Sequence, residues 1–69
     1  MDRAAVLSIA YHNMGVELEY LKRFDESIRT YEKAVNFAKK NIGVDNQIVI
    51  NFQKVLNQAK QQVIQNKFS

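Results

Sequence analysis

The sequence predicts an all-α protein with one small domain, and three observations support this prediction. Apolar side chains recur every three or four residues along most of the 69-residue chain, which is the spacing of one helix face. No segment alternates apolar and polar residues with the period of two that a half-buried strand requires. The helical pattern breaks only near residues 22–25 and 42–45, so we expect antiparallel helices with short connections. The chain is too short for a second domain.

The first expected helix covers residues 4 to about 21. The apolar positions that we assign to its buried stripe are Leu7, Tyr11, Met14, Leu18 and Leu21.

The second expected helix covers residues 26 to about 41, with Asp25 as its predicted N-cap. Lys39 and Lys40 fall in the last turn, where their positive charges interact favourably with the negative end of the helix dipole. Gly43 is the residue at which we expect the helix to stop. Its apolar stripe consists of Ile28, Tyr31, Ala34, Val35 and Ala38.

The third expected helix covers residues 46 to about 67, with Asp45 as its predicted N-cap. Six further apolar positions lie within ~60° of Phe52 around its axis: they are Ile48, Val49, Val55, Leu56, Ala59 and Val63. Ile50, Ile64 and Phe68 lie on the opposite side. They are either a self-association surface or single exposed apolar residues, which are common on protein surfaces.

The net charge of +3 lies entirely in residues 46–69, which carry Lys54, Lys60 and Lys67 and no acid. Three lysines along some six helical turns form a thin stripe, whereas nucleic-acid binding usually shows clustered Lys and Arg. We expect a solvated polar face here, and keep a nucleic-acid or anionic-surface binder as the alternative function.

No group of residues indicates catalysis. The chain has no cysteine and one histidine, and its two glycines are too far apart for a phosphate-binding loop. His12 and Glu19 are the only candidate metal pair, and two residues make a poor site. We therefore expect no enzyme, cofactor, metal or small-molecule substrate. Without a long apolar run or a secretory signal, we expect an intracellular, cytoplasmic protein with no membrane association.

The first two segments also carry a specific order of large and small residues. It consists of Tyr11, Met14, Gly15, Leu18, Phe24, Ser27, Tyr31 and Ala34. Gly15 has no Cβ and Ser27 and Ala34 are small, so two helices with these residues can pack closely. The order resembles the tetratricopeptide repeat.

The resemblance covers residues 8 to about 41, with departures. Met14 replaces a leucine, Leu18 an aromatic residue and Ser27 an alanine, while Lys39 stands where a proline often ends the repeat. The Gly-x-Asp loop at 43–45 is similar to the longer repeats of the kinesin light chain group.

The resemblance implies a hairpin over 4–41 and a capping helix over 45–67. It also implies a concave, peptide-binding face made of Ile9, His12, Asn13, Val16, Glu19 and Tyr20. The alternative is that this face packs on a neighbouring repeat or subunit.

The expected function is a non-enzymatic protein–protein interaction module or assembly scaffold. A stable stack normally needs about three repeats. We therefore expect either the C-terminal part of a longer protein or a self-associating unit. The expected partner is a protein or peptide, and the expected oligomer is a homodimer.

Overall fold

The computed structural model describes residues 3–68, and their side chains as far as residue 65. Within this part there are three helices, α1 (Arg3–Tyr20), α2 (Phe24–Asn41) and α3 (Gln47–Phe68), and no strand. The all-α prediction is confirmed, and each helix end lies within two residues of its expected position.

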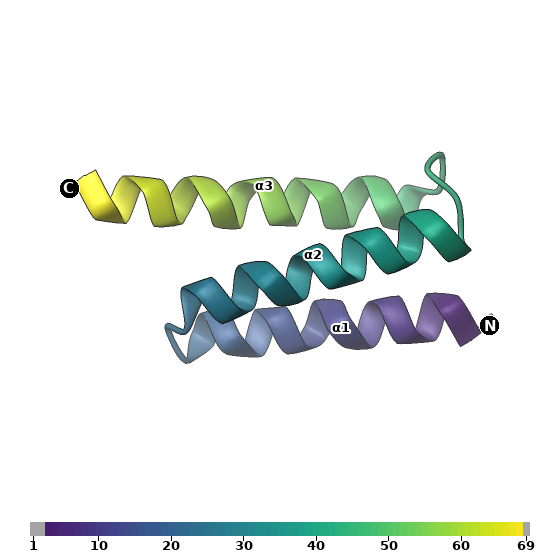
Figure 1. The fold of residues 1–69 in the computed structure, drawn as a ribbon, viewed down its shortest axis with the longest axis horizontal. Coiled ribbons are helices and arrows are strands. Elements are labelled where there is room, and N and C mark those ends of the chain that lie inside the picture. Colours follow the sequence, from purple (N-terminus) through teal and green to yellow (C-terminus); the bar gives the residue numbers. More distant parts are fainter. Residues whose placement is uncertain (1–2, 69) are drawn as a thin grey trace.

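The helices lie side by side in one layer, with α2 in the middle (Figure 1). α1 and α2 form an antiparallel hairpin, and α3 runs back along the other side of α2 and extends past its first turn (Figure 1). The shortest dimension is 13 Å, about the diameter of one helix with its side chains. Consequently α2 has a neighbour on both sides, whereas α1 and α3 each have one main neighbour.

The core belongs mainly to α2 and α3. Its buried members are Tyr31, Ala34, Val35, Ala38, Val49, Phe52, Leu56 and Ala59. Ile28, Ile48 and Val55 are partly buried against them, which confirms the stripes predicted for both helices. Ile50 and Ile64 are exposed, as predicted, while the side chain of Phe68 lies outside the described residues.

The buried stripe predicted for α1 is wrong. Its buried residues are Ala5, Ser8 and Gly15, whereas Leu7, Met14 and Leu21 are 49%, 52% and 65% exposed. α1 is therefore turned about 100° around its axis from the expected orientation. In this orientation the Tyr31 ring of α2 lies against the backbone of Gly15, where a Cβ would come within 2.6 Å of the ring.

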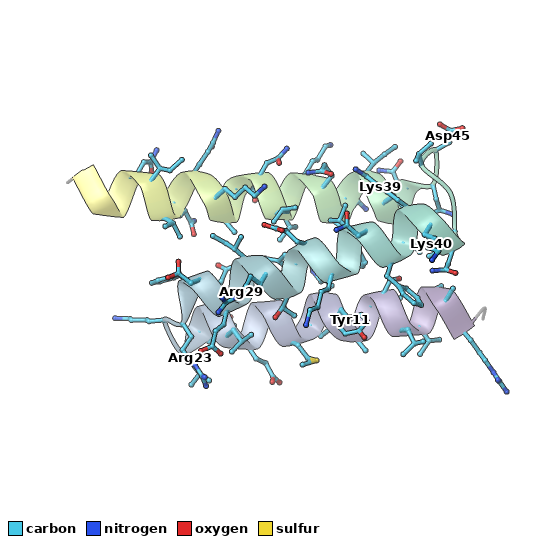
Figure 2. All side chains as sticks on the ribbon, viewed as in Figure 1. Tyr11, Arg23, Arg29, Lys39, Lys40 and Asp45 are labelled. Atoms are coloured by element: carbon cyan, nitrogen blue, oxygen red, sulfur yellow. The ribbon has the colours of Figure 1, made fainter. Side chains whose placement is uncertain are left out.

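Tyr11 and Leu18, at the edge of that stripe, are half-buried. The Tyr11 ring contacts the edge of Phe37 on α2, with 6.1 Å between the ring centres. Tyr11 thus packs beside α2 (Figure 2).

The N-cap of α2 differs from the prediction. The helix begins at Phe24, so Arg23 is at the N-cap. Asp25 lies in the first turn, where its negative charge interacts favourably with the positive end of the helix dipole. The Arg23 guanidinium instead pairs with Glu26, with 2.7 Å between Nη2 and Oε2.

The N-cap of α3 is Asn46 rather than Asp45. Asn46 Oδ1 accepts a hydrogen bond from the Ile48 amide at 2.9 Å, while Asp45 lies at the outer tip of the loop (Figure 2). Gly43 follows the last turn of α2 with φ of +120°, and its amide donates a hydrogen bond to the Ala38 carbonyl oxygen at 3.2 Å, so its predicted role as a helix stop is confirmed.

Candidate functional site

A close contact in the hairpin joins Gly15 on α1 to Tyr31 on α2. A Cβ on Gly15 would lie 2.6 Å from two carbons of the Tyr31 ring, closer than real Cβ atoms approach. Next to it, the buried Ser27 hydroxyl donates a hydrogen bond to the Gly15 carbonyl oxygen at 2.7 Å. The close helix approach predicted at Gly15 is present, and its neighbour is an aromatic ring.

Glu19 holds the far end of the same ring. The Tyr31 hydroxyl donates a hydrogen bond to Glu19 Oε1 at 2.5 Å. Burial, followed by this hydrogen bond, raises the pKa of Tyr31 above its ordinary value of 10.0. Glu19 therefore helps to fix Tyr31 between the helices, in addition to lying on the predicted peptide-binding face.

His12 connects α1 to α3. Its ring stacks on Phe52 with 4.4 Å between ring centres and an interplanar angle of 3°, and it is tilted over Tyr31 at 5.4 Å. Its Nδ1 is buried with no hydrogen-bond partner among the described residues. Burial lowers the pKa of His12, and the negative charge of Glu19 acts in the opposite direction.

The six residues of the predicted peptide-binding face have different surroundings. Ile9 and Val16 are half-buried against the core, so the chain itself partly covers these two residues of the face. His12 lies under Phe52, because α3 passes beside α1 at this point. Only Asn13 and Tyr20 are exposed.

Three of these six residues line a shallow hollow. Val16, Glu19 and Tyr20 surround it together with Tyr31, and its volume is about 300 Å³. Tyr20 is 84% exposed at its edge. The hollow combines an apolar wall, one carboxylate and two phenol rings. This surface is suited to a side chain of another protein.

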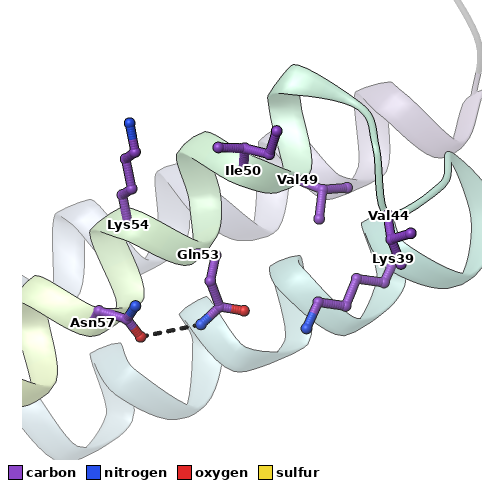
Figure 3. A pocket seen from close by; sticks show the side chains of 7 residues that line it. All are labelled: Lys39, Val44, Val49, Ile50, Gln53, Lys54 and Asn57. Carbon is purple, nitrogen blue, oxygen red and sulfur yellow. Dashed lines mark hydrogen bonds between the residues drawn. The ribbon is translucent and has the colours of Figure 1, made fainter.

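A second hollow, which the sequence did not predict, lies where α2 ends and α3 begins (Figure 3). It also has a volume of about 300 Å³. Its lining consists of Lys39, Val44, Val49, Ile50, Gln53, Lys54 and Asn57. We call it the α2–α3 cleft. The position of this cleft depends on the conformation of the connection at residues 42–46. No motif in the sequence predicts that conformation.

The predicted lysine stripe does not form one free surface in the described residues. Lys54 lines the α2–α3 cleft, whereas Lys60 Nζ lies 4.0 Å from Glu32 Oε1 on α2. The side chain of Lys67 lies outside the described residues. The described part of the stripe therefore presents Lys54 and Lys60 in different surroundings, with a carboxylate near Lys60.

The described residues contain no group of three or more His, Cys, Asp or Glu side chains placed to hold a metal ion. None of their helices has both the length and the apolar character that crossing a membrane requires.

Comparisons with models of protein families, with curated proteins and with solved structures found no match to this chain.

Proposed function

We propose that this chain is a non-enzymatic protein–protein interaction module of the tetratricopeptide type. The packing at Gly15 supports the proposal, since a small residue on one helix receives an aromatic ring from the other. Ser27 and Ala34, the small residues of the second helix, are both fully buried. We assign to α3, the helix that follows the hairpin, the role of the capping helix of the repeat.

The observation that carries the proposal is the unpartnered apolar stripe on α1. Leu7 and Met14, seven residues apart, lie on one side of the helix, and Leu21 follows directly after its last residue with its amide still bonded to the Glu17 carbonyl oxygen. All three are about half exposed or more, on a helix that has a single main neighbour. Several large apolar side chains exposed along one side of a helix favour a protein–protein contact. In a stack of repeats, such a stripe packs against a further helix.

The further helix comes from a longer parent chain or from a second copy of this chain, and we propose the second copy for the isolated chain. Closed two-fold dimers are the commonest assemblies of identical chains. The α1 stripe is separate from the hollow at Val16, Glu19 and Tyr20, so a dimer through α1 leaves this hollow open for a peptide.

Light scattering over a dilution series tests the proposal. We expect a mass above the 8.0 kDa of one chain at micromolar concentration, and a single-chain mass for the double variant Leu7→Asp, Met14→Asp. The matched control is Asn13→Asp, Asn36→Asp, which adds the same charge at exposed positions off the stripe. A wild-type mass of 8.0 kDa at all concentrations would contradict self-association.

A further inference from the structure

The α2–α3 cleft lies on the side of α3 that faces away from α1. Ile50, Lys54 and Asn57 are at about 140–160° from Phe52 around the α3 axis. Phe52 is the residue that stacks on His12 of α1. The cleft is therefore separate from the hollow at Val16, Glu19 and Tyr20, and its occupant does not depend on the proposed function.

Two lysines give the cleft a positive charge that the described residues do not neutralise. Lys39 extends along it from the last turn of α2, while the stem of Lys54, from the second turn of α3, lines its rim and the ammonium group points outward (Figure 3). Both side chains are exposed, and neither forms an ion pair within residues 3–65. By contrast, Lys60, six residues further along α3, has its Nζ 4.0 Å from Glu32 Oε1.

Apolar side chains form the rest of the wall. Val49 is buried, while Val44 and Ile50 are 63% and 40% exposed. The exposed valine on the loop and the exposed isoleucine on the helix leave apolar surface that an aliphatic side chain can cover.

The amides of Gln53 and Asn57 complete the cleft. Gln53 Nε2 donates a hydrogen bond to Asn57 Oδ1 at 3.1 Å (Figure 3). This bond fixes the two side chains relative to each other and leaves the Asn57 amide nitrogen available as a donor. The cleft thus offers cationic groups, an amide donor and a small apolar surface.

We propose that the α2–α3 cleft binds an acidic peptide segment of a partner protein. An aliphatic side chain of the segment contacts Val44 and Ile50, and flanking carboxylates pair with Lys39 and Lys54. A volume of about 300 Å³ is at the small end of ligand pockets, which fits one or two side chains. A nucleic acid fits less well, since no aromatic residue lines the cleft for base stacking.

The probe is a short, capped, fluorescein-labelled peptide in which one leucine is flanked by glutamates. Fluorescence anisotropy measures its affinity, and backbone amide NMR maps where it binds. We expect shift changes at Val44, Ile50 and Lys54, and affinity about tenfold lower when the glutamates are replaced by glutamines. Replacing the leucine with serine is expected to weaken binding as well.

The variant Lys39→Gln, Lys54→Gln is expected to lose about tenfold in affinity. Its matched control is Arg29→Gln, Lys33→Gln, which removes the same charge from exposed positions on α2 outside the cleft. We expect the control to change affinity by less than about twofold. Circular dichroism of both variants checks that they fold.

Four results would overturn the proposal: no binding, equal losses in the two variants, shift changes confined to Val16 and Tyr20, or tighter binding of a single-stranded oligonucleotide than of the peptide. Failure of the proposed function has a different signature. It would appear in the mass of the wild-type chain, which this titration does not measure.

Discussion

At the scale of single residues, Gly15 has the largest influence on how the hairpin packs. Tyr31 is 2% exposed, with one edge of its ring against the α1 backbone at Gly15 and its hydroxyl bonded to Glu19. A ring that is held in this way cannot move aside cheaply for a new methyl group. The missing side chain of Gly15 is thus a packing requirement.

Gly15→Ala is therefore expected to destabilise the protein. Alanine improves intrinsic helix propensity by about 1 kcal/mol, but overpacking a tight contact costs about 1–3 kcal/mol. We expect a net loss in the free energy of unfolding, measured by urea denaturation followed by circular dichroism. Asn13→Ala, at an exposed α1 position, is the control and is expected to be neutral or stabilising. A rise in stability for Gly15→Ala would show that Tyr31 yields easily.

His12 gives a prediction about pH. Its pKa is lowered from 6.5 in the folded protein, so the folded state favours the neutral ring. The unfolded state then binds the proton more readily, and stability falls as the pH drops below 6.5. The sequence contains no other histidine, so the effect can be assigned.

The measurement is urea denaturation at several pH values between about 7.5 and 5, above the range in which Asp and Glu titrate. We expect the wild type to lose stability over this range and His12→Gln to lose less. The opposite slope would mean that attraction between Glu19 and the protonated ring outweighs burial.

At the scale of elements, the sequence predicted the bounds of all three helices and the buried faces of α2 and α3, but not the buried face of α1. α2 and α3 each have one continuous apolar stripe, so periodicity alone identifies the buried face. α1 has large apolar residues on one side and small ones on another, and the large ones suggested the wrong face. What decides its orientation is Tyr31, a residue of the neighbouring helix.

The candidate surfaces were less predictable than the helices. The sequence grouped Val16, Glu19 and Tyr20 correctly on one side of α1, because helical spacing determines that grouping. It could not show that α3 covers His12, since this depends on the angle between separate helices. It also missed the capping role of Asn46, which stands next to the equally plausible Asp45.

The docking of α3 depends on its buried stripe. Leu56 is 4% exposed in the core between α2 and α3. We expect Leu56→Ala to lower the free energy of unfolding by about 2–4 kcal/mol. Ile64→Ala, on the exposed side of the same helix, is expected to change it by less than about 0.5 kcal/mol. Urea denaturation measures both, and equal effects would indicate that α3 does not depend on this stripe.

At the scale of the whole molecule, the single layer explains why apolar surface remains exposed. A layer of helices buries both sides of α2 but only one side of α1 (Figure 1). A chain of this size also buries only about 60% of its unfolded surface, so its own core gives little stability in reserve. Covering the α1 stripe with a second copy would add to that stability.

Assembly through the α1 stripe and folding of the chain are therefore linked. If the native chain pairs through Leu7, Met14 and Leu21, its melting temperature rises with protein concentration, because association stabilises only the folded state. We expect that rise for the wild type and for Tyr20→Asp, which changes the other exposed side of α1. We expect no rise for Leu7→Asp, Met14→Asp. Loss of the concentration dependence in Tyr20→Asp instead would place the contact beside Val16 and Glu19, where a second copy would compete with a peptide for the same hollow.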